Sequence, residues 1–531
     1  MGRNIVIAFV LIFLMLIFWN YISTRRAPKE QKPPTTTVVE KEEVKEREVP
    51  EEITTIKTAP ETEAALDTVY TLMYRIILSA RGATIKSMAL KEYKDPEGNN
   101  VELIRAGERA LTDVINLDGE LLDLKDAVFK VIERTPNKLV YSFTLPSGET
   151  VLKEYSFVDT SYMFSLYVTL PEAEKYKISW DAGLEFTEKY TELRFFSALA
   201  YMGGGIVPRE LSKLKKKPYE LQGDIDWVGT KNKYFLAAIV PDNVRTEKCS
   251  MMRFGTGMVS GGGGCCTPYA QCGAGGGTPK VPNEDTQIGV SLFTEYKSPM
   301  RFKIYVGPLD YDLLKKFGVG LQEACYLGFK WIRPISKFIL AILLGLHKVI
   351  RNYGVVIIVF ALMISLVFFP LTRSQQKSMK GLAQLQPKLQ ALQKKYKKNP
   401  QALNRATMEL YRKHKVNPLG GCLPLIVQMP IFFALYAILS STIALRGTSF
   451  LWVSDLSQKD PIFVLPILMG ATMLISARIQ PQQQSQQKMF TYMMPIIFTF
   501  LFLSFPAGLV LYWLVYNVFS IVESYIVRRT L

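Results

Sequence analysis

The chain has 531 residues, 48% of them hydrophobic, and a formal net charge of +17. Residues 24–349 hold 44 Lys and Arg against 43 Asp and Glu, so residues 1–23 and 350–531 carry the other +16. The two histidines, His347 and His414, lie far apart in sequence, which argues against a histidine-based catalytic centre. No GxxxxGK[ST] phosphate loop and no CxxC pair occurs, so we expect no nucleotide hydrolysis, no metal site and no cofactor.

Residues 1–23 are predicted to form a transmembrane anchor. Residues 5–19 are an unbroken apolar run, and Tyr21 and Ile22 extend it towards the ~20 residues that a spanning helix needs. A cleaved signal peptide is the alternative, but no small-x-small cleavage site follows the run.

A tether and a large β domain are expected to follow the anchor. Residues 24–63 are rich in Pro, Thr, Glu and Lys, a composition typical of a solvated linker. Strand signals dominate residues 64–319, as in FSLYVTL, where Phe164, Leu166 and Val168 share one face. Short runs of this kind between turn signals predict an antiparallel β-sandwich.

One segment of the predicted β domain, residues 255–277, does not resemble its surroundings. Ten of its 23 residues are glycine and it has no periodicity, so it cannot bury a core. It is interpreted either as a flexible insertion or as the product of a frame error that replaced one or two strands. Peptide mapping by mass spectrometry distinguishes the two, since a genuine insertion must yield its own peptides.

Residues 320–353 are predicted to form an amphipathic helix in the membrane interface. Only the nine residues 338–346 are consecutively apolar, too few to span a bilayer, and lysines and arginines flank them. Residues 354–531 are predicted to form a multi-pass helical bundle. Its spans are placed at about 354–371, 419–443, 461–478, 490–505 and 508–527.

The loop at 373–415 sets the expected orientation. It holds 12 Lys and Arg against the single Glu409, which predicts a cytoplasmic location. Counting spans outwards places residues 24–349 outside the cytoplasm and both termini inside it. Several spans are short for a bilayer, so local thinning of the membrane is expected.

The same loop is predicted to be a helical hairpin that breaks at Asn399–Pro400. Four leucines, Leu382, Leu385, Leu389 and Leu392, recur at helical spacing and can face the partner helix. The opposite face is cationic and is either a solvated surface or a docking surface for acidic partners such as ribosomal RNA or a targeting receptor. The docking candidates are Lys388, Lys394, Lys395, Lys397, Lys398, Arg405, Arg412 and Lys413.

Gln428 is the clearest candidate for a polar site within the membrane. An amide inside the apolar string LPLIVQMPIF is costly unless it meets water or a partner. An interhelical hydrogen bond is the alternative explanation. Tyr512, Trp513 and Asn517 add further polar groups to the last predicted span.

Four strings in residues 320–531 resemble the YidC/Oxa/Alb family of membrane-protein insertases, and they occur in the family's order and spacing. They are FFPLTRSQQKSMKGLAQLQPKLQ, KVNPLGGCLPLIVQMPIFFALY, LPILMGATM and FPAGLVLYWLVYN. The anchor and the β domain are similar to the arrangement in the Gram-negative branch, where the periplasmic domain is a β-supersandwich.

The resemblance implies an insertase and chaperone of the bacterial inner membrane, not an enzyme. In such a protein a hydrophilic groove among five helices receives the polar segment of a client and releases its apolar helix into lipid. The implied partners are nascent membrane proteins, the Sec translocon with its accessory subunits, the ribosome and targeting receptor, and membrane lipids. Gln428, Tyr512, Trp513 and Asn517 are expected to contribute to the groove, together with Ser365.

Ser365 departs from the family pattern, which usually has Arg or occasionally Lys at this position of the second span. No charged residue lies between Arg351 and Arg373. A serine keeps the groove hydrogen-bonded but attracts no anion. We therefore expect a weaker preference for clients with acidic N-terminal tails.

Two other classes of protein remain as alternatives. A carrier or channel with a polar pathway would need intramembrane charge or repeated broken helices, of which residues 354–527 offer little. A tethered periplasmic carbohydrate-binding protein or enzyme would use the sandwich, but no histidine occurs between 24 and 346.

Overall fold

The structure is a computed structural model that describes residues 53–55 and 65–530, apart from 118, 189–194, 216, 255–257, 261–279, 283–286, 398, 415, 417–422 and 480–484. The predicted anchor, most of the predicted tether and most of the glycine-rich segment lie outside these residues. The chain divides into two compact units at Cys325–Tyr326. We call them the β unit, which ends at Cys325, and the helical unit, which begins at Tyr326.

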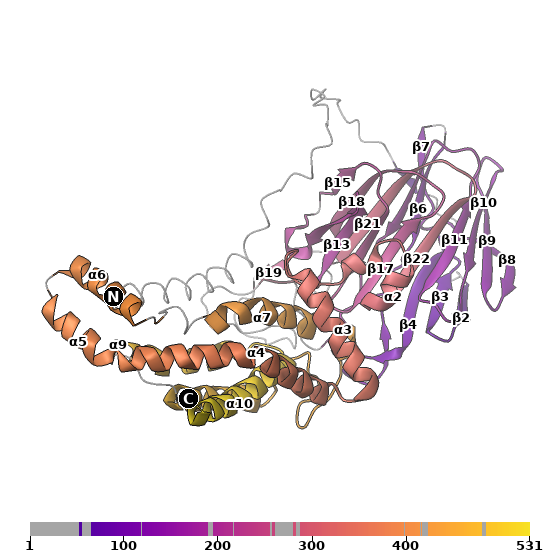
Figure 1. Ribbon diagram of the computed structural model, residues 1–531. Helices are drawn as coiled ribbons and strands as arrows, with labels where there is room; N and C mark the ends of the chain where they lie inside the picture. The colour runs from indigo at the N-terminus through magenta and orange to yellow at the C-terminus, as the bar shows by residue number, and fades with distance from the viewer. Residues whose placement is uncertain are drawn as a thin grey trace. The chain divides into compact units, whose positions relative to one another are not determined.

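Two large sheets form most of the β unit (Figure 1). In spatial order, the described strands of the larger sheet are β14 (Gly205–Glu210), β13 (Ser197–Met202), β16 (Trp227–Lys231), β17 (Phe235–Pro241), β22 (Met300–Pro308), β11 (Met163–Thr169), β10 (Thr150–Ser156), β9 (Lys138–Thr144) and β8 (Lys130–Thr135). Those of the second are β1 (Ile53–Thr55), β7 (Glu120–Asp123), β6 (Thr112–Leu117), β12 (Lys175–Trp180), β21 (Gln287–Glu295), β18 (Thr246–Phe254) and β15 (Tyr219–Gln222).

The described part of the β unit also contains two smaller sheets and the short helices η2 (Leu211–Lys213), α2 (Tyr311–Lys316) and η3 (Leu321–Ala324). The sheets are β2 (Leu66–Tyr70), β3 (Tyr74–Ser79), β4 (Thr84–Lys94) and β5 (Asn100–Glu102), and the pair β19 (Met258–Ser260) and β20 (Lys280–Pro282). β1 lies in the predicted tether and pairs with β7 in parallel, with Ile53 opposite Leu121.

The core of the β unit lies between the two large sheets, since β21 contacts both β16 and β13 of the other sheet. Along β11 the side chains alternate, with Phe164, Leu166 and Val168 buried. This alternation and the antiparallel sandwich confirm the prediction from the sequence, because side chains two residues apart on a strand point to the same face.

The strand β8 forms one edge of the larger sheet, and all six of its residues are exposed. Lys130, Glu133 and Arg134 place charges along this edge, and the pairing with β9 is irregular between Val131 and Glu133. Arg134 forms an ion pair of 3.2 Å with Asp67 on β2. The edge strand is therefore charged, pairs irregularly with β9 and is joined by an ion pair to β2, a strand of another sheet.

Eight α-helices make up most of the described part of the helical unit. They are α3 (Arg333–Val349), α4 (Tyr353–Gln384), α5 (Gln386–Lys395), α6 (Pro400–Lys413), α7 (Leu423–Ser441), α8 (Val464–Ile479), α9 (Ser485–Phe502) and α10 (Ala507–Thr530), with a short η5 (Ile443–Leu445) after α7. Among the described residues, Tyr353–Gln384 and Ala507–Val527 are long and apolar enough to cross a membrane. Val427–Ser441, Val464–Ile479 and Met493–Phe502 are shorter apolar helices.

Helix α4 continues thirteen residues beyond 371, the predicted end of the first span of the bundle. Residues 372–384 contain good helix formers, and the next proline is Pro387 at the start of α5. The predicted break at Asn399–Pro400 is present, because the Asn399 side chain accepts a hydrogen bond from the Ala402 N–H (3.0 Å) and Pro400 opens α6.

The start of α4 packs closely against a loop. Asn352 caps the helix by accepting a hydrogen bond from the Val355 N–H at 3.2 Å. A Cβ placed on Gly354 would lie 2.1 Å from Cδ2 of Phe450 and 2.7 Å from its Cβ. Gly354 therefore permits an approach that no larger residue allows.

Candidate functional site: polar contacts between apolar helices

Helix α4 carries a row of polar side chains on one face, from its middle towards its C-terminal end. Ser365, Thr372 and Gln376 are seven and four residues apart, which places them on the same side of a helix. All three are buried, and α4 lies beside α10 over much of its length (Figure 1). Buried polar groups need hydrogen-bond partners, so the facing surface of α10 should supply them.

Helix α10 presents Glu523 and Ser524 to this row. Ser365 Oγ donates a hydrogen bond of 2.6 Å to Glu523 Oε1. Gln376 Nε2 donates one of 2.9 Å to Ser524 Oγ. We call these five residues, Ser365, Thr372, Gln376, Glu523 and Ser524, the α4–α10 polar cluster.

A second polar contact joins α7 to α10. Gln428 Nε2 donates a hydrogen bond of 2.7 Å to the Tyr512 hydroxyl, and both side chains are buried. The Tyr512 ring also lies 6.1 Å from the Phe360 ring on α4. Gln428 is therefore satisfied by the kind of interhelical hydrogen bond that the sequence left open, and its partner is another of the predicted groove residues.

Trp513 and Asn517 have different surroundings. Trp513 packs among aromatic rings, 5.4 Å from Phe432 and 5.6 Å from Phe502 between ring centroids. Asn517 Nδ2 is buried and has no hydrogen-bond partner among the described residues. The structure thus pairs Gln428 with Tyr512 and Ser365 with Glu523, but it does not bring all five predicted groove residues into direct contact.

Sequence reasoning missed Glu523, Thr372, Gln376 and Ser524. For Glu523 a signal was present, because it is the one acidic residue in the last predicted span, 508–527. An ionisable residue in such a span is by itself a hypothesis of function. Gln376 and Thr372 carried no comparable signal, since they lie at the predicted end of a span, where polar residues are common.

The hairpin α5–α6 exposes the predicted cationic surface. Three of the four leucines of the predicted stripe, Leu382, Leu385 and Leu389, are buried, and Leu392 is half-buried. Lys398 lies outside the described residues. The other seven predicted docking residues, Lys388, Lys394, Lys395, Lys397, Arg405, Arg412 and Lys413, are exposed.

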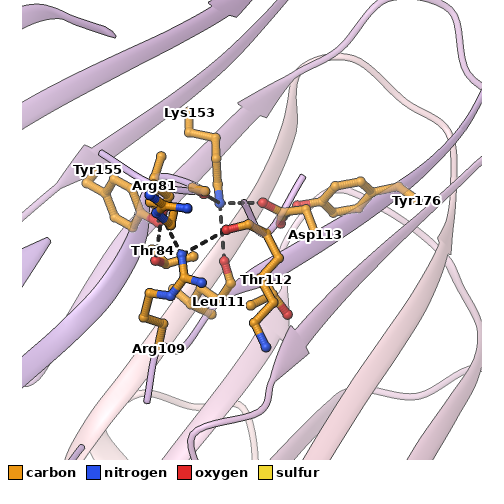
Figure 2. Close-up of polar contacts among 12 residues, drawn as sticks. Arg81, Thr84, Arg109, Leu111, Thr112, Asp113, Lys153, Tyr155 and Tyr176 are labelled. Atoms are coloured by element: carbon orange, nitrogen blue, oxygen red, sulfur yellow. Dashed lines mark hydrogen bonds and ion pairs between the residues drawn. The ribbon is translucent and has the colours of Figure 1, made fainter. Parts of the chain in front are cut away.

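The β unit contains a separate group of charged side chains, which Figure 2 shows. Lys153 on β10 forms an ion pair with Asp113 on β6, and both side chains are almost completely buried. Lys153 Nζ also donates to the carbonyl oxygens of Gly82 (3.0 Å) and Leu111 (3.2 Å). The Tyr176 hydroxyl donates a hydrogen bond to Asp113 Oδ1.

Burial raises the pKa of Asp113, and the neighbouring Lys153 and Tyr176 oppose that rise. At the rim, Arg109 donates a hydrogen bond of 2.8 Å to Asp126 and holds the pKa of that carboxyl below its usual range. The charged groups at the centre face protein atoms and are shut off from solvent. We interpret this cluster as a means of joining strands, not as a catalytic centre.

A metal site is not indicated in the part of the chain that the structure describes, where no three His, Cys, Asp or Glu residues are grouped to hold an ion.

Comparison with known proteins identifies two matching families. The family of the 60Kd inner membrane protein matches residues 345–531, and the YidC periplasmic domain family matches residues 67–273. The chain is 32% identical to "Membrane protein insertase YidC" of Chlorobium limicola over 581 aligned positions, covering 100% of this chain and 95% of that protein. It is 34% identical to the protein of the same name from Geobacter sp. strain M21, covering 87% of this chain and 85% of that protein.

Among solved structures, the crystal structure of YidC from Thermotoga maritima matches at 15% identity and a TM-score of 0.31. The match covers 87% of this chain and 99% of that one.

Proposed function

This chain belongs to the YidC family of membrane protein insertases and is a protein of the bacterial inner membrane, and from that premise we propose how it moves its clients. In the proposal, the polar segment of a client passes along polar side chains between α4, α7 and α10, and the client's apolar helix then enters the lipid. The observation that carries the proposal is the burial of Gln428 and Tyr512 as a hydrogen-bonded pair inside apolar helices.

The energetics of insertion support a passage without fuel. Transfer of an apolar helix from water into hydrocarbon is favourable by about 25 cal/mol for each Å² of apolar surface removed from water. The barrier is the polar flank, because unpaired polar groups in hydrocarbon cost several kcal/mol each. Side chains that can exchange their hydrogen bonds with the client lower this barrier.

The Gln428–Tyr512 pair and the α4–α10 polar cluster together offer such side chains. Gln428 and Tyr512 can each donate and accept, as can Ser365 and Gln376. In the resting protein these groups satisfy one another. During insertion they would release one another and hydrogen-bond the passing client.

The finer topology and the partners form part of the proposal. The 12 Lys and Arg of residues 373–415 support a cytoplasmic hairpin, with residues 24–349 in the periplasm and both termini in the cytoplasm. The exposed cations of α5 and α6 support binding of ribosomal RNA or a targeting receptor. Cooperation with the Sec translocon on larger clients is also proposed, by analogy with the family.

Reconstitution of the purified protein in liposomes tests the proposal. A short client with one apolar span should become protected from external protease in the presence of the wild-type protein. Gln428→Leu should reduce the protected fraction several-fold, because Tyr512 loses its partner and the passage loses an amide. Protease protection of the client is the measurement.

Val427→Leu is the matched control. It adds a methylene at the neighbouring position of α7, whose side chain is 37% exposed, and should insert the client as the wild type does. If Gln428→Leu is folded and inserts the client as well as the wild type does, the Gln428–Tyr512 hydrogen bond only holds α7 against α10 and has no role in passing the client. If the wild type protects no client, the chain does not insert proteins without a partner.

A further inference from the structure

We propose that Glu523 gives the groove a preference for basic and neutral client segments over acidic ones. This inference rests on the proposed function and adds to it the charge of the segment that the groove accepts. It starts from the position of one carboxylate between two spanning helices. Glu523 lies on α10 and is buried against α4, with Ser365 as its hydrogen-bond donor at 2.6 Å.

Glu523 is the only charged residue within the apolar stretches of α4, α7 and α10, of which the stretch in α4 ends at Arg373 and that in α10 at Arg528. Residues 353–372 of α4, the whole of α7 and residues 507–527 of α10 contain no other Asp, Glu, Lys or Arg. In the part of the chain that the structure describes, the carboxylate hydrogen-bonds the hydroxyl groups of Ser365 and Thr372 and forms no ion pair. When it is ionised, this carboxylate therefore has no cationic partner among the described contacts.

A fixed negative charge in a poorly solvated site acts strongly on other charges. Coulomb energies grow as the effective dielectric constant falls, and the interior of a helix bundle screens far less than water. An acidic client side chain that reached the α4–α10 polar cluster would meet a like charge. A lysine or arginine of the client would pair with the carboxylate and donate hydrogen bonds to its oxygens. A neutral amide would form hydrogen bonds there without electrostatic repulsion.

The identity of residue 365 adds to this effect. A basic side chain at this place would lie within reach of Glu523 and neutralise it, because the serine hydroxyl already contacts the carboxylate. Serine is neutral, so its hydrogen bond leaves the negative charge of Glu523 in place. When Glu523 is ionised, the two residues together therefore carry a net negative charge.

The experiment compares three clients that differ only at two positions of the translocated segment, which carry Asp, Asn or Lys. Insertion is measured by protease protection in liposomes of zwitterionic lipid without a membrane potential, so that neither the surface nor a voltage selects by charge. With the wild type, the Asp client should insert about ten-fold less than the Asn client. With Glu523→Gln, the ratio of Asp to Asn yields should rise to near one.

The ratio is taken within each preparation, so a smaller folded fraction in a variant does not change it. Glu523→Asp keeps the charge and should keep the low ratio. Glu97→Gln removes an acidic charge from an exposed turn of the β unit and should also leave the ratio as in the wild type. Ser365→Arg provides a second, independent variant, which should raise the ratio by neutralising Glu523.

The outcomes separate the inference from the proposed function. If the wild type fails to insert even the Asn client, the proposed function is wrong. Suppose that the Asn client inserts but the ratio of Asp to Asn yields is the same in the wild type, Glu523→Gln and Ser365→Arg. The proposed insertase function is then supported, and the role of Glu523 in selecting clients is overturned. A ratio that rises in Glu97→Gln as well would also overturn it, because the effect would then follow net charge and not position.

Discussion

Buried charges occur in both units, and their partners differ. Lys153 and Asp113 in the β unit neutralise each other, and Tyr176 and two carbonyl oxygens complete their hydrogen bonds. Glu523 in the helical unit has hydroxyl partners only among its described contacts. A buried pair joins strands, whereas a buried single charge is free to act on a third group. We therefore assign the buried pair to stability and propose client selection for the single carboxylate.

Removal of one partner from the pair in the β unit should destabilise that unit strongly. Lys153→Met leaves Asp113 buried without a counterion, and such a change typically costs about 3–5 kcal/mol. The double variant Lys153→Met/Asp113→Leu removes both charges and should recover much of the loss. Thermal unfolding of the full chain, followed by hydrogen exchange in peptides from β6 and β10, measures the effect.

Lys130→Met is the control for this prediction, since Lys130 is an exposed lysine on β8. Surface substitutions usually change stability by less than about 0.5 kcal/mol. Equal losses in Lys130→Met and Lys153→Met would contradict the importance assigned to the buried ion pair.

At the scale of helices, the fit between α4 and its neighbours depends on glycine at one position and not at another. Gly354 stands where a Cβ would lie 2.1 Å from the Phe450 ring, whereas nothing lies within 4 Å of a Cβ on Gly345 of α3. Glycine in a helix normally costs about 1 kcal/mol relative to alanine. The close packing at Gly354 requires a residue without a side chain. At Gly345 no neighbouring atom requires one.

The two glycines should respond oppositely to alanine. Gly354→Ala overpacks the start of α4 and should lower the stability of the helical unit by about 1–3 kcal/mol. Gly345→Ala should raise it by about 0.5–1 kcal/mol, since it improves helix propensity in open space. Melting temperatures of the detergent-solubilised proteins measure both changes, and a loss of stability in Gly345→Ala would contradict this account.

Local sequence patterns predicted the helices and strands well, but for the most part they did not predict which helices and strands contact each other. The alternation in β11 and the Asn399–Pro400 break follow from side-chain period and capping chemistry, both of which lie within a few residues. The continuation of α4 past 371 was not predicted, because the end of an apolar run marks a membrane boundary and not a helix end. The contact of Ser365 with Glu523 joins residues 158 positions apart and depends on how α4 and α10 pack.

At the scale of the whole molecule, charge is distributed very unevenly. Residues 24–349 are nearly neutral, while the 12 Lys and Arg of residues 373–415 supply most of the net charge of +17. The exposed cations of α5 and α6 are concentrated in a short stretch of chain. Such a concentration attracts polyanions far more strongly than the same charge spread over the surface.

Binding of ribosomes to the reconstituted protein should therefore depend on salt and on this hairpin. The triple change Lys394→Gln, Lys395→Gln and Lys397→Gln should weaken binding at low salt and reduce the slope of log affinity against log salt by about 2, since fewer counterions are released. Co-sedimentation at a series of salt concentrations gives the slope.

A control with the same net charge separates position from total charge. The exposed lysines Lys130, Lys175 and Lys297 of the β unit can be changed to Gln together. This variant should keep the wild-type slope. If both triple variants lose affinity equally, the hairpin is an ordinary solvated surface.

The charged edge strand β8 has a consequence for aggregation. An insertase meets chains that have not yet folded, and an unpaired sheet edge is a template on which such chains can add as further strands. The lysine, glutamate and arginine along β8, its irregular pairing with β9 and its ion pair to β2 all disfavour that addition. The edge of the β unit is therefore protected against the addition of unfolded chains as extra strands.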